Sequence, residues 1–166
     1  MRNEATRGMW SQRTRAGRLL PWALAFGLAL LATGVHLGVS DHQLLNYDDN
    51  IDLDPAHPSL RHGLTVATIG WAFTSIEHAN WMPLTRLSWL LDISLFGFGP
   101  RPFLLGNVLY HALASVLLFS ALRALTGAMR RSALVAAIFA VHPLGVESIA
   151  WAAERKDVLC GAFWIA

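Results

Sequence analysis

Two adjacent carboxylates form the most distinctive chemical feature of the sequence. Asp48 and Asp49 stand in an acidic, turn-forming segment beside Tyr47 and two asparagines. Because neighbouring carboxylates repel each other, one of the pair is expected to have a raised pKa or to meet a cation. Such a carboxylate can act as a general base toward a hydroxyl nucleophile. A solvated turn is the alternative interpretation, since Asn and Asp are ordinary turn residues.

Ionisable side chains gather a second time toward the C-terminal end. Arg155 and Lys156 together can neutralise a phosphate, because Arg presents a planar fork of donors and Lys a point charge. His142 and Glu147 are candidate metal ligands, so a divalent cation is one candidate cofactor, although two ligands alone make a weak site. Anchoring of long side chains at the membrane surface explains the same residues without any ligand.

A further polar pair lies inside an apolar run. Asn107 and His111 are four residues apart, which places them on one face of a helix. Polar groups inside a membrane span are costly and usually face a cavity or a partner helix. A hydrogen bond between helices explains the pair as well as a role in a site does, and we favour the structural explanation.

The composition indicates that these groups are positioned by membrane helices. Hydrophobic residues make up 54% of the 166 residues and charged residues 14%. Soluble domains carry about a quarter charged residues, so too few polar side chains exist here to cover a globule. The basic residues are concentrated in a tail and do not suggest a folded basic face, so no nucleic-acid partner is expected.

The first apolar run predicts an anchor whose N-terminus is cytoplasmic. Residues 1–18 form a basic tail with five arginines, and residues 19–39 form an uncharged run long enough to cross about 30 Å of hydrocarbon. A cleaved signal peptide is the alternative, but no clear cleavage site precedes Asp41. Under the positive-inside rule the arginines remain in the cytoplasm, and the acidic segment that follows lies outside.

The rest of the chain divides into alternating polar and apolar segments. Residues 40–102 carry seven acidic residues against three arginines, and the Trp-rich stretches 60–73 and 84–96 suit short helices in the membrane interface. The prediction is a second span at 103–125, a cytoplasmic loop at 126–132, a third span at 133–147, and at 148–166 an outer-face segment that begins a fourth helix. Together these segments predict an all-α fold of several transmembrane helices.

The C-terminal residues predict that the sequence continues. The fourth apolar stretch is still running at Ala166, with no loop, cap or charged flank after it. We therefore expect the chain to be the N-terminal part of a longer multispanning protein. A stop codon directly after Ala166 would instead favour a remnant or an accessory membrane protein.

Several motifs, taken as a set, resemble one family. Along the chain they are Tyr47-Asp48-Asp49, Trp71-Ala72-Phe73-Thr74, Asn80-Trp81-Met82-Pro83-Leu84-Thr85, Leu91-Asp92, Leu95-Phe96-Gly97, Asn107, His111, His142-Pro143-Leu144-Gly145-Val146-Glu147-Ser148 and Trp151-Ala152-Ala153-Glu154-Arg155-Lys156-Asp157. The series resembles bacterial multispanning membrane proteins with C-terminal tetratricopeptide repeats. These are similar to the transmembrane and tetratricopeptide-repeat O-mannosyltransferases, which belong to the type C glycosyltransferases.

The resemblance implies a membrane-embedded transferase with a catalytic first outer loop. Its donor would be a sugar, with mannose as the candidate, on a polyprenyl phosphate, and its acceptor a hydroxyl on a protein or glycan. Asp48 or Asp49 would act as base, and Arg155, with Lys156 beside it, would hold the donor phosphate. His142, Glu147, Asn107 and His111 match motif positions without an assigned role. The location implied is the inner membrane, with the acidic loop in the periplasm and membrane lipid around the helices.

Two other functions are alternatives to the membrane transferase that the resemblance implies. A non-catalytic membrane scaffold or accessory protein would bind partners without needing the acidic pair. A transporter fragment would line a path with Asn107, His111 and His142, but the sequence shows no inverted repeat of the kind common in transporters. Since the repeat domain and the later helices are missing, a chain of only these residues is not expected to be active alone.

Overall fold

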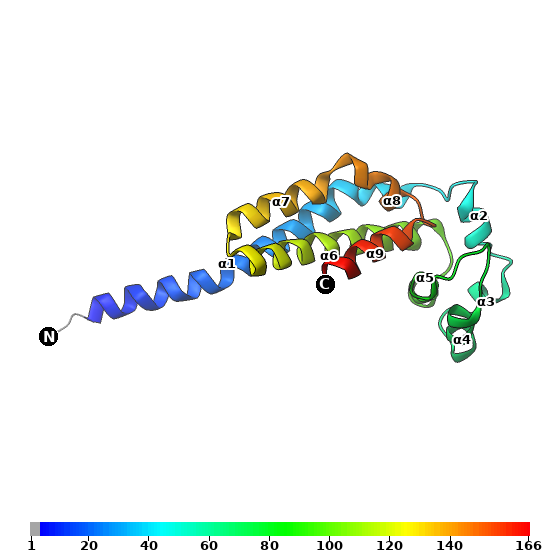
Figure 1. Ribbon diagram of the computed structural model, residues 1–166, viewed down its shortest axis with the longest axis horizontal. Helices are drawn as coiled ribbons and strands as arrows, with labels where there is room; N and C mark the ends of the chain where they lie inside the picture. Colours follow the sequence, from blue (N-terminus) through cyan, green and yellow to red (C-terminus); the bar gives the residue numbers. More distant parts are fainter. Residues whose placement is uncertain (1–3) are drawn as a thin grey trace.

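The protein is helical throughout the part of the chain that the structure describes. The computed structural model describes the backbone of residues 4–166 and the side chains from Leu19 onward, and this part contains no β-strand (Figure 1). Its elements are α1 (Glu4–His36), the 3-10 helix η1 (Leu37–Asp41), α2 (Asp48–Asp52), α3 (Pro58–Arg61), α4 (Val66–Thr74), α5 (Pro83–Phe96), α6 (Pro100–Thr126), α7 (Met129–Val141), the 3-10 helix η2 (Pro143–Gly145), α8 (Val146–Ala150) and α9 (Arg155–Ile165). The predicted all-α class is confirmed.

Two helical segments are long and apolar enough to cross a membrane. They are Leu19–Asp41 and Pro100–Thr126, and a third candidate is the pair α7 and η2–α8, which bends by 51° at the break. Helix α9 has 11 residues and is shorter than the roughly 20 that a span requires. The predicted basic tail, 1–18, lies outside the described side chains, although the backbone of α1 runs through it from Glu4.

Small side chains let α1, α6 and α7 approach one another closely. Ala32, Ala112 and Ala140, one from each helix, form a buried cluster. A second cluster joins Leu28, Phe119 and Ala136 further along the same helices. Close packing of small residues is the usual basis of helix association in lipid, where apolar burial alone gives no advantage.

Helix α7 ends at a proline, and side chains from other helices satisfy a carbonyl near its end. Pro143 has no N–H to continue the helical hydrogen bonds. The carbonyl oxygen of Ala140 lies 3.0 Å from Nε2 of His36 and 3.2 Å from Nε2 of His111. Each imidazole donates an N–H to this oxygen, so the end of α7 is tied to both α1 and α6.

Helices α2–α5 lie together at one end of the bundle (Figure 1). The turn between α6 and α7 lies at the opposite end, where Gly127 adopts a left-handed conformation with φ 66°. The N-terminus of α1 is also at that end (Figure 1). The two basic segments of the sequence therefore share one end of the molecule, and the acidic segment occupies the other.

Buried Arg86 on α5 holds the loop between α4 and α5. Its guanidinium donates to the carbonyl oxygens of Ser75, at 2.6 Å, and Asn80, at 3.4 Å, and lies 5.0 Å from the ring centroid of Trp71. Glu77 accepts hydrogen bonds from the indole of Trp71 at 2.9 Å and from the hydroxyl of Ser75 at 2.8 Å. These contacts fold residues 71–86 into a compact unit.

Candidate functional site

The two adjacent aspartates have different environments. Asp49 is 1% exposed, and its carboxylate accepts backbone N–H groups of Leu45 at 2.8 Å and of Ala153 at 2.7 Å. Asp48 is half-buried, and in the described part of the chain its side chain makes no hydrogen bond. Asp49 is therefore committed to holding the backbone, whereas the carboxylate of Asp48 is available to another group.

Burial affects the protonation of Asp49. Loss of solvent raises the pKa of the Asp49 carboxyl above its ordinary value, against the opposing effect of the N–H groups of Leu45 and Ala153. The negative charge of Asp48 adds to the increase.

Arg155 is enclosed by protein atoms. Its side chain is fully buried and forms an ion pair with Asp92, with Nη1 2.5 Å from Oδ2. Nε donates to Oδ1 of Asn107 at 2.8 Å, Nη1 to the hydroxyl of Ser88 at 3.3 Å, and Nη2 to the carbonyl oxygen of Phe103. The guanidinium thus joins α5, α6 and α9, and a phosphate could reach it only if these contacts rearranged.

Asn107 connects Arg155 to the end of α8. Its amide nitrogen lies 2.9 Å from the carbonyl oxygen of Trp151, with Ser148 and Ile149 carbonyls at 3.4 and 3.3 Å. These carbonyls at the end of a helix lack intrahelical partners. Asn107 therefore serves as a cap that another helix supplies to α8.

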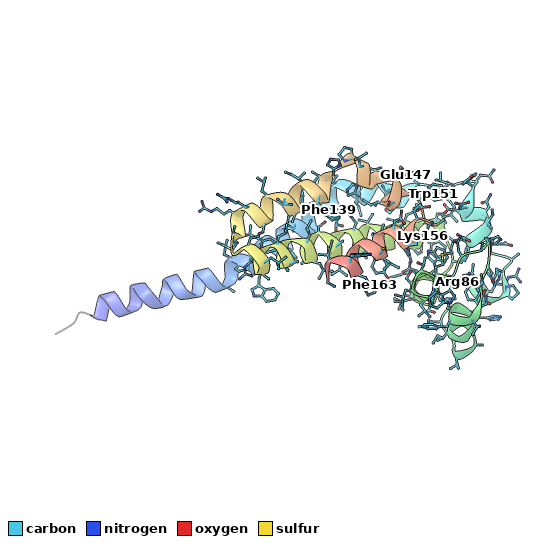
Figure 2. The ribbon with its side chains drawn as sticks, viewed as in Figure 1. Arg86, Phe139, Glu147, Trp151, Lys156 and Phe163 are labelled. Atoms are coloured by element: carbon cyan, nitrogen blue, oxygen red, sulfur yellow. The ribbon has the colours of Figure 1, made fainter. Side chains whose placement is uncertain are left out.

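The turn between α8 and α9 links the two groups of site residues. Ala153 in this turn donates its N–H to Asp49, while Trp151 and Arg155, on either side of it, contact Asn107. The position of the acidic pair therefore depends on Asn107, which lies on the buried side of α6. Figure 2 shows Trp151 and Lys156 near this turn, at the same end of the molecule as Arg86.

Lys156 is the more accessible of the two predicted basic residues. Its side chain is 39% exposed and pairs with Glu154 at 2.8 Å. Leu159 and Phe163 follow at helical spacing on α9, and both line an apolar groove of about 390 Å³ between α4, α5, α6 and α9. Lys156 itself does not line this groove, but it lies one helical turn before Leu159, at the start of the same face of α9.

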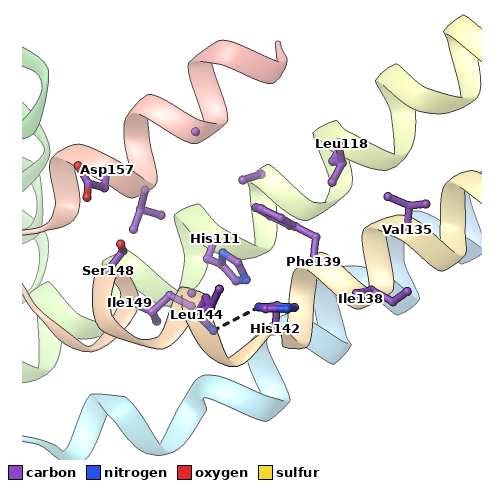
Figure 3. Close-up of a pocket in the computed structure, with 14 residues that line it drawn as sticks. His111, Leu118, Val135, Ile138, Phe139, His142, Leu144, Ser148, Ile149 and Asp157 are labelled. Carbon is purple, nitrogen blue, oxygen red and sulfur yellow. Dashed lines mark hydrogen bonds between the residues drawn. The ribbon is translucent and has the colours of Figure 1, made fainter.

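The two predicted histidines lie beside a different cavity. His111 and His142 line a largely apolar cavity of about 530 Å³ between α6, α7, α8 and α9 (Figure 3). Nδ1 of His142 accepts the N–H of Leu144 at 3.3 Å, which begins the 3-10 helix after the break. Both imidazoles thus satisfy backbone groups around the bent α7–α8 pair.

Glu147 lies apart from the two histidines. It borders a separate cleft, next to Asp41 and Trp151. Among the described residues no group of three or more His, Cys, Asp or Glu side chains is arranged to hold a metal ion. The structure does not bring His142 and Glu147 into one site.

Sequence reasoning missed several buried polar partners. Asp92, which occurs in the motif series, pairs with Arg155 across 63 residues of sequence, and His36 meets Ala140 across 104. Ser88 and Arg86 are also buried. The sequence offered one signal for these contacts: Asp92 and Arg86 are charged residues within a Trp-rich apolar stretch. Their partners could not be predicted, because residues so distant in sequence leave no local pattern.

Comparison with known proteins identifies relatives of one kind. The chain is 32% identical to human protein O-mannosyl-transferase TMTC4 over 106 residues, which is 55% of this chain and 14% of that protein. It is 31% identical to mouse protein O-mannosyl-transferase TMTC3 over 122 residues, covering 71% of the chain and 13% of the relative. It is 35% identical to Drosophila melanogaster protein O-mannosyl-transferase Tmtc1 over 82 residues, 49% of the chain and 10% of the relative.

The matches define how far the comparison extends. No family model and no solved structure matches the chain. The chain spans about one-seventh of the length of the first two relatives. Over that stretch, the relatives support the O-mannosyltransferase family that the motifs predict.

Proposed function

We propose that this chain is the part of a membrane glycosyltransferase that activates the acceptor and holds the donor phosphate. The donor is a sugar on a polyprenyl phosphate, and the acceptor is a hydroxyl of a protein. The observation that carries the proposal is the division within the acidic pair: Asp49 is fixed to the backbone at Leu45 and Ala153, and Asp48 beside it is left available. The names of the relatives supply the reaction class.

In the proposed reaction Asp48 is the general base. Its carboxylate takes the proton of the acceptor hydroxyl while the oxygen forms a bond to the anomeric carbon of the sugar. The bond between that carbon and the phosphate oxygen breaks, and the polyprenyl phosphate leaves with the electron pair. A cation near the phosphate stabilises the charge that develops there.

Lys156 and the apolar groove suit an amphiphilic donor. A polyprenyl phosphate has an anionic head and a long apolar chain, which correspond to the ammonium of Lys156 and to the groove lined by Leu159 and Phe163. We assign the phosphate contact to Lys156. Arg155, also predicted from the sequence to bind phosphate, would act by holding the turn that carries Lys156, since its own donors are occupied.

The distribution of charge supports an outer-face site. Arg130 and Arg131 lie in the first turn of α7, at the end of the bundle opposite α2–α5. Basic residues near short loops remain in the cytoplasm. The proposed orientation therefore places the acidic pair on the periplasmic side of the inner membrane and the N-terminus in the cytoplasm.

The test is transfer of a radiolabelled sugar from a polyprenyl phosphate to a threonine-containing peptide, in membranes from cells that express a full-length homologue with each substitution made at the matching position. Asp48→Asn should lower the rate by about 10²–10⁴-fold, the usual contribution of a general base. Asp54→Asn, at another half-buried position of the same acidic segment, is the matched control and should leave the rate unchanged. Equal rates for Asp48→Asn and the control would refute the assignment.

The buried network favours one alternative function. Because Asp49, Asn107 and Arg155 are all used to hold the fold together, the same motifs also suit a non-catalytic membrane scaffold. A scaffold would show no transfer in the wild-type protein, and partner recovery after cross-linking would be unaffected by Asp48→Asn. The transfer assay with the same variants therefore separates the two functions.

A further inference from the structure

A second cleft opens beside the acidic pair, on the outer end of the bundle. It encloses about 600 Å³ between residues 41–46 and α8, and Glu147, Ala150 and Trp151 form its other wall. Figure 2 shows Glu147 and Trp151 along the same short stretch of chain. The cleft shares no lining residue with the apolar groove below Lys156, so the two can be occupied independently.

The charges around this cleft are unsuited to a phosphate. Among the described residues that line it, Asp41 and Glu147 contribute carboxylates, His42 contributes an imidazole, and there is no lysine or arginine. Both carboxylate-bearing residues are exposed at the rim. An anionic donor would be repelled here, whereas a neutral or cationic group would be accepted.

The backbone along one wall is irregular and incompletely paired. Residues 43–45 belong to no helix or strand. The N–H of Leu45 is held by Asp49, but across the described residues no hydrogen bond uses the N–H groups of Gln43 and Leu44. The open N–H groups of Gln43 and Leu44 can donate hydrogen bonds to the backbone carbonyls of a second chain that lies alongside them.

An aromatic pair, Tyr47 and Trp151, lies between this cleft and the acidic residues Asp48 and Asp49. The rings of Tyr47 and Trp151 lie 6.0 Å apart, and Tyr47 is 69% exposed. The indole N–H of Trp151 is buried and has no hydrogen-bond partner among the described residues. Asp48 follows Tyr47 directly, so a chain lying along residues 43–46 would pass next to the proposed base.

We propose that this cleft binds the acceptor as an extended polypeptide segment, with a hydroxyl residue beside Asp48 and a Lys or Arg near Glu147. The inference rests on the proposed function for the identity of the hydroxyl as acceptor. The carboxylates at the rim select the basic side chain, and the backbone of residues 43–45 aligns the segment. In this arrangement the donor occupies the apolar groove and the acceptor occupies the cleft, and both reach the acidic pair.

The test measures peptide binding without any donor. The probes are two fluorescein-labelled nonapeptides, each with one threonine, flanked by lysines in one and by glutamates in the other. Binding to the chain in lipid nanodiscs is followed by fluorescence anisotropy. The lysine peptide should bind more tightly, and Glu147→Lys should weaken it about fivefold, as expected for an exposed ion pair, while strengthening the glutamate peptide.

Controls separate the cleft from folding and from catalysis. Asp54→Lys makes the same charge reversal outside the cleft and should leave both affinities unchanged; Glu147→Gln replaces Glu147→Lys if that variant fails to fold. Equal affinities for the two peptides, or the same change in both, would overturn the proposal. The proposal would also be overturned if Glu147→Lys dissociated a dimer of the protein, because the cleft would then be an interface between two copies of this chain.

The outcome is distinguishable from failure of the proposed function. If the lysine peptide binds as expected but no sugar is transferred, the cleft is supported and the transferase assignment fails. If sugar is transferred and Glu147→Lys leaves the KM for the peptide unchanged, the transferase assignment is supported and the cleft proposal fails.

Discussion

Two arginines are buried among the side chains that the structure describes, and they differ in how far along the sequence their partners lie. Arg155 and Arg86 are 0% and 2% exposed. The ion-pair partner of Arg155 is 63 residues away, and its hydrogen bonds join α5, α6 and α9. Within the described part of the chain, the guanidinium of Arg86 bonds to and stacks on residues between Trp71 and Asn80, all within 15 positions of itself.

The difference shows how one residue type can serve two structural purposes. Arg155 fastens separate helices together, so its loss should loosen the whole bundle. Arg86 folds a single loop whose carboxylate, Glu77, is one-third exposed, so its loss should remain local. The following measurements test that distinction, from the largest expected effect to the smallest.

Replacement of Arg155 by methionine should have the largest effect. It leaves Asp92 as a buried charge without its partner and removes the donor to Asn107. Breaking a buried pair in this way costs about 3–5 kcal/mol. The free energy of unfolding in mixed micelles measures the loss, and a value below about 1 kcal/mol would show that the network is not holding the helices.

Replacement of Arg86 by methionine should cost about 1.5–3 kcal/mol, the usual contribution of hydrogen bonds to a charged group. Hydrogen exchange should accelerate at residues 71–86 and remain unchanged in α6. Acceleration across α6 would contradict the separation between the two clusters.

Substitution of Gly106 by alanine tests the close packing around Arg155. An added Cβ would lie 2.5 Å from Nη2 of Arg155 and 2.8 Å from Oδ2 of Asp92. Overpacking of this kind costs about 1–3 kcal/mol. Gly70→Ala on α4 is the matched control, because nothing lies within 4 Å of a Cβ there. Equal thermal unfolding of the two variants would indicate that Arg155 moves freely.

The smallest effect should be a pH dependence of opposite sign at the two ends of the acidic segment. Burial acts to raise the pKa of Glu77, but hydrogen bonds from Trp71 and Ser75 with the charges of His57 and Arg86 outweigh it, so the pKa is lowered. Its contribution to stability is present above the ordinary value of 4.5 and is lost as the pH falls further. The difference in unfolding temperature between wild type and Glu77→Gln should therefore shrink below pH 4.5.

Asp49 should behave in the opposite way. Burial raises the pKa of this carboxyl, so the folded state binds its proton more readily than the unfolded state does. Stability from this group is present at low pH and declines as the pH rises through the raised pKa. In Asp49→Asn that decline should disappear; an unchanged profile would contradict the raised pKa.

The sequence predicted the helices better than the contacts between them. Apolar runs bounded by charge, Pro and Gly predicted helices in the regions of α1, α6 and α7, because lipid requires every backbone group to be satisfied within a helix. The shared face of Asn107 and His111 followed from spacing alone.

Pairings across the fold were beyond prediction from local patterns. The partners of Arg155 lie on two other helices, and the unequal roles of Asp48 and Asp49 depend on the backbone of Ala153, more than 100 residues later. An acidic pair has the same local pattern whether one member is buried or both are solvated. Which of them is available for chemistry depends on the turn between α8 and α9.

The break after α7 has a consequence for how the protein is assembled in the membrane. The carbonyl of Ala140 finds its donors on α1 and α6, at His36 and His111. Since an unsatisfied backbone group in lipid costs several kcal/mol, α7 is not stable in the membrane without α1 and α6. Both donors precede it in the chain, so we expect α7 to leave the translocon after α1 and α6 and to dock against a helical hairpin that is already inserted.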